Sequence, residues 1–174
     1  MDTGGSGISG LPSRLAEQSI TIGSGTGLTV NHVGFVNRQV YKVTVDYTAL
    51  AAAAVTADKT IATLPAKTKV VGIYADTTTK YIGGAVTAAS LVVGTTAGGA
   101  ELIATHDVFA AAIMRGLVDA DMGTLMTRAA AIQGGTLPSW TATNIISVRI
   151  TTTTANTNAL TQGSTTYYIV TERF

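Results

Sequence analysis

The residues that could do chemistry in this chain are few, and the two histidines come first. His32 and His106 lie far apart in the sequence, and neither has a second metal ligand at helical or strand spacing. His106 precedes Asp107, but neighbouring residues of a strand point to opposite faces, so the two side chains would not pair. We therefore expect a turn or cap at Asp107 and no catalytic or metal role for either histidine.

The acidic residues contain one short pattern that is similar to a calcium loop. Asp119 and Asp121 stand shortly before Gly123, as carboxylates do at the start of such a loop. The third ligand and the distal glutamate are missing, so we interpret this stretch as a polar turn in which both carboxylates bond local backbone. The other acidic residues show no converging pair of the kind that general acid–base catalysis needs.

The glycine-rich run GSGTG at 23–27 is the remaining candidate for a ligand loop. It does not follow a strand in a βαβ unit and does not lead into a helix, so it lacks the context of a phosphate-binding turn. The serines form no nucleophile elbow, and the chain has no cysteine. We predict a protein that is not an enzyme and that requires no metal and no cofactor.

Composition favours a structural protein whose surface is covered by other protein. Charged residues make up 12% of the chain, about half of the roughly 25% that is usual in soluble domains. Hydrophobic residues make up 46%, and the mean hydropathy is +0.35. Since free monomers rarely leave large apolar patches exposed, we expect the protein to bury surface against itself or a partner.

The net charge and the length of the apolar runs indicate which classes of partner to expect, and the first residues bear on where the protein is made. The net charge is +1, and the eleven basic residues form no run or patch, so we expect no nucleic-acid partner. The most apolar run, at 49–55, is much shorter than the ~20 residues that cross a bilayer, so we expect no membrane partner. The first residues show no signal peptide, and we expect synthesis in a cytoplasm.

Strict alternation of apolar and polar residues begins at Arg38 and predicts half-buried strands. Tyr41, Val43 and Val45 share one face of the first, and further alternating runs occupy 144–154 and 164–174. Both faces of the last run are apolar, which favours a central strand. The predicted core includes Val43, Val45, Val71, Ile73, Ile146, Val148, Ile150 and Ile169.

Other stretches are less regular. A strand is expected to end at Pro65, a strand or a hairpin with a turn near 75–81 is expected over 68–84, and a strand ending in a glycine turn is expected over 89–99. Alanine favours helical turns after Tyr47 and over 107–114. Six to eight short strands with turns between them predict a mainly β fold, a sandwich or barrel.

The first thirty-seven residues differ from the rest, and we divide the chain into an extended Gly-rich arm at 1–37 and a β-sandwich domain at 38–174. Two interpretations stay open for the arm, a disordered tail and a segment that becomes ordered against a partner. Regularly interposed side chains favour the second, because thirty extended residues span up to ~100 Å and could touch several neighbours. The partner-binding residues predicted in the arm are Leu11, Arg14, Leu15, Ile20 and Ile22.

Three short segments carry a family resemblance: TLPA at 63–66, VVGTTAGGAELI at 92–103 and LTQGSTTYYIV at 160–170. With their short Thr/Ala-rich strands, glycine turns and low charge, they resemble small β-sandwich virion proteins of tailed bacteriophages, and in particular the capsid decoration, or cement, proteins. The resemblance covers about residues 40–174 and includes no catalytic motif.

The resemblance implies a jelly-roll-like β-sandwich on the exterior of a phage capsid. It implies that the major capsid protein is the partner, that the protein stabilises the shell by bridging coat subunits, and that it forms a homotrimer. Two alternatives remain. A receptor- or glycan-binding head-fibre or tail protein would expose aromatic residues at loop tips, for which Trp140 is the candidate, and a bacterial surface or pilus-like subunit would need a secretion signal.

Overall fold

The structure is a computed structural model, and it describes residues 18–19, 28–35, 38–110, 112, 114–115, 122–124, 126, 139–140 and 143–173. Within them the chain forms strands and two 3-10 turns and no α-helix. The elements are β1 (Gln18–Ser19), β2 (Leu28–Phe35), β3 (Arg38–Asp46), η1 (Tyr47–Leu50), β4 (Thr56–Leu64), β5 (Thr68–Ile82), β6 (Ala88–Gly94), β7 (Ile103–Asp107), β8 (Met114–Arg115), β9 (Ser139–Trp140), β10 (Asn144–Thr153), η3 (Thr157–Ala159) and β11 (Gln162–Arg173).

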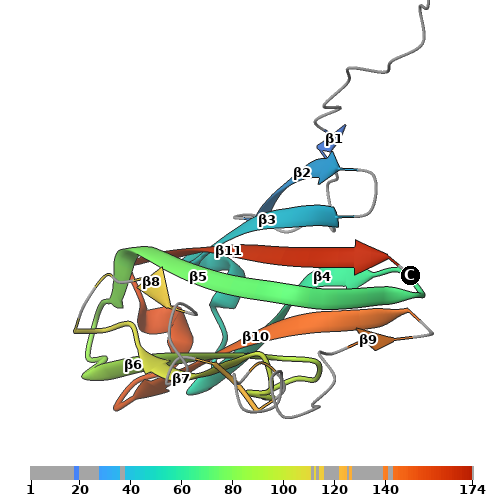
Figure 1. The fold of residues 1–174 in the computed structure, drawn as a ribbon. Helices are drawn as coiled ribbons and strands as arrows, with labels where there is room; N and C mark the ends of the chain where they lie inside the picture. The colour runs from blue at the N-terminus through green and yellow to red at the C-terminus, as the bar shows by residue number, and fades with distance from the viewer. Residues whose placement is uncertain are drawn as a thin grey trace, which may run out of the picture.

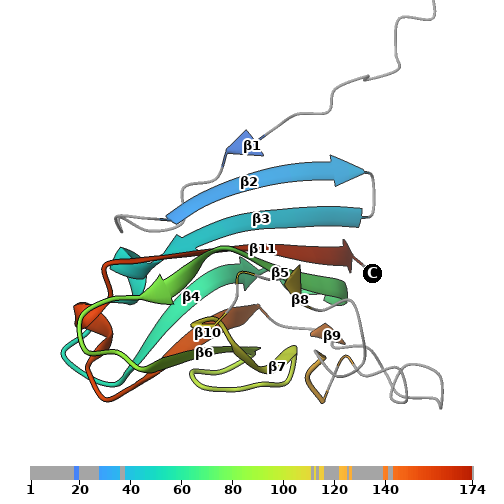
Figure 2. The ribbon, with the colours of Figure 1, turned by 90° about the vertical axis from the view of Figure 1, so that its left-hand side faces the viewer.

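The strands form two antiparallel sheets, one above the other (Figures 1 and 2). The larger sheet has the order β1-β2-β3-β11-β5-β8, with β9 also paired to β5, and the smaller has the order β4-β10-β6-β7. This arrangement confirms the predicted mainly β sandwich. Its jelly-roll character stays a prediction.

The core lies between the two sheets and follows the predicted alternation. Alternate residues of β3, β10 and β11 are buried, as expected for strands that are covered on one face. Seven of the eight predicted core residues are buried: Val43, Val45, Ile73, Ile146, Val148, Ile150 and Ile169.

Val71 is the exception, and its prediction was wrong. Val70 is fully buried and pairs with Thr171, whereas Gly72 pairs with Val170, so the pairing of β5 with β11 passes over Val71 at a bulge. A bulge adds one residue to one strand and shifts which side chains face inward. Regular alternation read from the sequence therefore places Val71 on the inner side, while the structure leaves it only half-buried.

Residues 68–82 form one long strand and not a hairpin. The expected turn near 75–81 is absent because β5 continues through the threonines to Ile82 and pairs with β11 along its length. β-branched threonine suits an extended backbone, and the buried hydroxyls of Thr77 and Thr165 hydrogen-bond each other at 3.0 Å.

The other local expectations have mixed outcomes. β11 lies between β3 and β5, as predicted for a strand with two apolar faces, and β4 ends at Leu64, directly before Pro65. The helical turn expected after Tyr47 is present as η1, which Asp46 caps. Over 107–114 the described residues are not helical, and Met114 instead begins β8.

The larger sheet also takes in chain that precedes Arg38. β2 pairs with β3 in register from Leu28 opposite Val45 to Phe35 opposite Arg38. This strand falls within the range assigned to the arm, and the division at residue 37 stays a prediction. Among the described residues no helix has the length and apolar character to cross a membrane.

Candidate interaction surface

Of the residues first considered for chemistry, His106 and Asp107 are the ones whose side chains the structure describes. His106 is buried, with Nδ1 3.1 Å from the Ala104 carbonyl oxygen, while Asp107 is exposed on the next position. Asp107 Oδ1 accepts hydrogen bonds from the backbone N–H groups of Phe109 and Ala110, which is the expected cap. Asp119 and Asp121 lie outside the described residues, and within these no three metal-ligating side chains come together.

The predicted partner-binding residues of the arm also lie outside the described residues. This holds for Leu11, Arg14, Leu15, Ile20 and Ile22, whose roles stay predictions. Trp140 belongs to the short strand β9, which pairs with the start of β5, and its side chain is not among those described.

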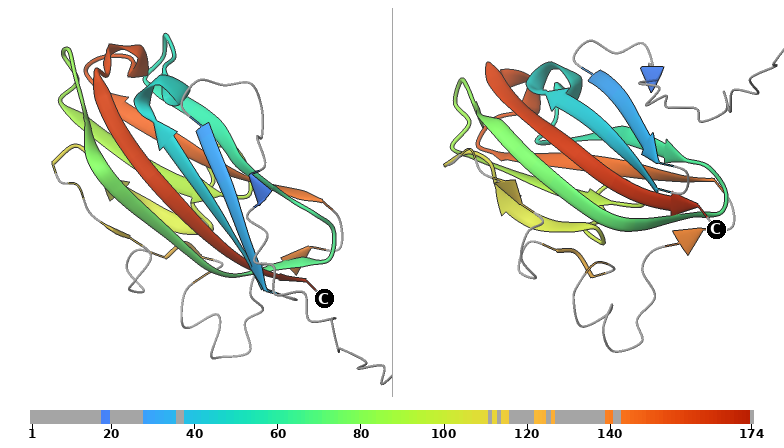
Figure 3. Two further views of the ribbon diagram at one scale, coloured as in Figure 1. Left: turned by 90° about the horizontal axis from the view of Figure 1, so that it is seen from above. Right: turned by 45° about the horizontal axis from the view of Figure 1, so that its top comes forward.

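The outer face of the larger sheet is the most distinctive surface of the described chain. β3, β11 and β5 lie side by side there, and no described element covers them (Figure 3). Their register sets outward-facing residues in rows across the three strands, because paired residues of antiparallel strands share a face. We call this surface the tyrosine face; its residues are Val40, Val170 and Gly72 in one row, Lys42, Tyr168 and Tyr74 in the next, and Thr44, Thr166 and Asp76 in the third.

Two half-buried tyrosines occupy the middle of the tyrosine face. Tyr74 lies over Gly72, where a β-carbon would come within 3.4 Å of the tyrosine hydroxyl oxygen. The Lys42 ammonium lies 5.6 Å from the centroid of the Tyr168 ring, which is a cation–π contact. These contacts hold both side chains close to the sheet, so that the surface presents aromatic and aliphatic groups to whatever lies over it.

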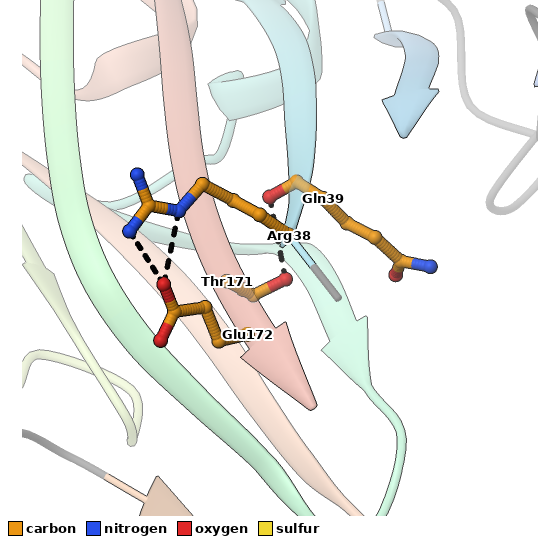
Figure 4. Close-up of polar contacts among 4 residues, drawn as sticks. All are labelled: Arg38, Gln39, Thr171 and Glu172. Atoms are coloured by element: carbon orange, nitrogen blue, oxygen red, sulfur yellow. Dashed lines mark hydrogen bonds and ion pairs between the residues drawn. The ribbon is translucent and has the colours of Figure 1, made fainter. Parts of the chain in front are cut away.

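Charged residues border the tyrosine face beyond Val40 and Val170. Nε and Nη2 of Arg38 both donate to Glu172 Oε1 across the β3–β11 pair, and the Thr171 hydroxyl donates to the Gln39 carbonyl oxygen beside them (Figure 4). Lys69 lies opposite Glu172 on the other side. The apolar rows thus end at a charged border on the exposed sheet.

The outer face of the smaller sheet has a different character. Arg149 of β10 forms a two-point ion pair with Asp58 of β4, with Nε–Oδ1 and Nη2–Oδ2 distances of 2.8 and 2.7 Å. This hydrogen bonding raises the pKa of Arg149. Small and hydroxyl-bearing residues, among them Ala88, Ser90, Thr151 and Thr153, line a shallow depression of about 300 Å³ on the same sheet. His106 and Asp107 also belong to its lining, whereas no tyrosine, phenylalanine or tryptophan of the described residues does.

Two further tyrosines are buried between the sheets and cannot contact a partner. The Tyr81 hydroxyl donates to the Val45 carbonyl oxygen at 2.9 Å, and burial raises the pKa of Tyr81. Tyr167 is fully buried, and its hydroxyl makes no hydrogen bond of ordinary geometry with the described residues. Burial raises the pKa of Tyr167 well above its usual value, and the neighbouring Tyr81 raises it further, while the nearby Thr165 acts in the opposite direction. Both groups serve the core.

Sequence reasoning did not identify the tyrosine face. The alternation in β11 separates Tyr167 from Tyr168, and this much the sequence indicates. It does not indicate that Tyr168 lies between Lys42 and Tyr74, because these neighbours come from strands more than 90 residues away that only the sheet order brings together.

Comparison with known proteins gives one distant likeness. No family model matches the chain, and no curated protein matches it. A solved structure described as the cyanophage Pam1 capsid asymmetric unit aligns with 94% of this chain and 100% of that chain, with 15% identity and a TM-score of 0.43. A likeness at this level is too distant to assign a fold family or a function.

Proposed function

We propose that the protein is a non-enzymatic structural component of a phage virion that binds the outside of the capsid. The tyrosine face is the observation that carries the proposal of a structural role: a sheet surface with Val40, Val170, Tyr74 and Tyr168 in adjacent rows is suited to burial within a protein assembly, against coat protein or against another copy of this chain. The low charge of the chain and its resemblance to decoration proteins support the same role.

In this proposal the major capsid protein is the partner, and the sandwich holds neighbouring coat subunits together. The arm residues before Leu28 extend the reach of each copy, and copies associate with one another, as a homotrimer according to the family resemblance. Several weak contacts made by one molecule are effective because, after the first, each further contact forms within the same complex.

The proposal is tested by adding the purified full chain to capsids of the phage that encodes it, after removal of the native protein. We expect the chain to sediment with the capsids in saturable amounts and to raise the temperature at which they release DNA. Bovine serum albumin at the same concentration is the control. Absence of saturable binding, or binding without any shift in the release temperature, would contradict the proposed stabilising role.

A further inference from the structure

Two opposite charges stand on either side of the central strand of the tyrosine face. Lys42 is in register with Tyr168 from β3, and Asp76 is in register with Thr166 from β5. Two strand spacings of ~4.8 Å and a two-residue offset of ~6.8 Å separate their backbones by about 12 Å. Neither side chain forms an ion pair with another described residue, and the described contact of the Lys42 ammonium is the Tyr168 ring, which can be kept or exchanged when a carboxylate approaches.

We propose that the tyrosine face binds the tyrosine face of a second copy of this chain around a two-fold axis. We place the axis in the plane of the interface, perpendicular to the line from Lys42 to Asp76 and through its midpoint. This midpoint lies over β11, between Thr166 and Tyr168. Rotation about this axis sets Lys42 of each copy against Asp76 of the other, because a two-fold contact uses the same surface twice. The same rotation brings the two Tyr168 and Tyr74 pairs together at the centre.

Charge complementarity favours a second copy over an unrelated partner. A partner that buries both charges is favoured if it offers a carboxylate to Lys42 and a cation to Asp76 at the same separation, and an identical face does both. The sheet around the tyrosine face contributes area as well. The strands β3, β11 and β5 over about nine residues give a projected area of roughly 440 Å², and side-chain relief together with the flanking surface would have to bring this toward the ~800 Å² per partner of a stable interface.

This inference rests on the self-association contained in the proposed function, and it specifies the contact. A face-to-face contact of this kind produces a two-fold pair. The trimer implied by the family resemblance would instead need two different surface patches on each copy. The measured mass of the assembly therefore distinguishes a dimer from a trimer.

The test is a sedimentation-equilibrium measurement of the full chain at low ionic strength, with four charge variants. We expect the wild type to have twice the 17.7 kDa chain mass. Lys42→Glu and Asp76→Lys each set like charges against each other twice and should raise the dimer dissociation constant more than about tenfold. The double variant Lys42→Glu with Asp76→Lys restores both pairs and should return within about threefold of the wild type. Lys80→Glu, an exposed change elsewhere on β5, is the matched control and should have no effect.

Each failure has a separate meaning. A wild-type trimer whose mass neither single variant changes would overturn the two-fold contact and leave the proposed function intact. A wild-type monomer at high micromolar concentration would overturn both the contact and the self-association on which it rests. Loss of dimer in both single variants without recovery in the double variant would overturn the Lys42–Asp76 pairing. Circular dichroism of every variant establishes that the fold is retained.

Discussion

Tyr167 and Tyr168 are adjacent residues of one strand and have opposite roles. The side chain of Tyr167 is fully buried between the sheets, whereas Tyr168 lies on the outer face beneath the Lys42 ammonium. The alternation of the strand alone separates the residue that stabilises the core from the residue that is available to a partner. At the residue scale, substitutions on the inner face should therefore lower the stability of the fold, whereas substitutions on the outer face should change the binding of a partner.

Val148→Asp tests the inner face. Val148 is fully buried in β10, and an unpaired carboxylate there costs several kcal/mol, a large part of the roughly 5–15 kcal/mol by which a domain is stable. We expect the variant to lack a cooperative thermal transition by circular dichroism. Thr151→Asp, on the exposed face of the same strand, should melt within a few degrees of the wild type. A normal transition for Val148→Asp would show that its side chain is not in the core.

The buried tyrosines predict a loss of stability at alkaline pH. Burial raises the pKa of both Tyr81 and Tyr167 above the ordinary value of 10.0. Below pH 10 the protonated hydroxyls are present in both states. Above it the unfolded chain releases protons that the folded chain still holds, so the free energy of unfolding should fall by up to ~1.4 kcal/mol per pH unit for each residue.

Urea titrations between pH 9 and pH 11.5 measure this effect. The Tyr167→Phe variant should lose stability less steeply with pH than the wild type, because one of the two groups no longer titrates. An identical slope in the two proteins would contradict the assignment of Tyr167 to the pH dependence.

At the element scale, β11 and β5 are neighbouring central strands of the larger sheet. They pair along most of their length, and Gly163 lies at an irregularity of this pairing, between the paired residues Gln162 and Ser164. Gly163 has φ of +152°, and a β-carbon there would lie 2.2 Å from Cδ1 of the Tyr81 ring. Only glycine allows the strand to begin so close to the buried ring.

Gly163→Ala should therefore destabilise the protein by about 2–4 kcal/mol through overpacking and backbone strain. Chemical denaturation with urea measures the change. Ser164→Ala, the next residue on the same strand and only half-buried, is the control and should change the free energy of unfolding by less than about 1 kcal/mol. An equal effect of the two substitutions would contradict the close approach of β11 to Tyr81.

Some features of these strands could be predicted from the sequence, and others could not. The faces of β3, β10 and β11 are predictable because alternation is a local property, and six of the correctly predicted core residues follow from it. The sequence left a strand and a hairpin open over residues 68–84 and favoured a turn near Thr77, because the pairing of Thr77 with Thr165 is not a local property. Val71 was misplaced because the bulge depends on the pairing with β11. The tyrosine face needs the order of strands, which no local pattern contains.

At the scale of the whole molecule, the proposed function gives separate tasks to the low-charge sandwich and to the predicted N-terminal arm. A compact domain alone contacts its immediate surroundings, whereas the arm would reach further along a shell. A truncation that removes residues 1–27 tests this division and keeps β2, which pairs with β3. We expect the truncated protein to melt within a few degrees of the full chain and to bind capsids more than about tenfold more weakly, since several anchors are lost together. Unchanged binding would mean that these residues do not contact the capsid.

A cryo-EM reconstruction of the native particles would show directly where the protein lies. We expect density for the two-sheet domain on the outer surface of the capsid, at symmetry-related positions, with each copy touching more than one coat subunit. Density for the domain in the tail, inside the shell, or nowhere on the particle would contradict the proposed function.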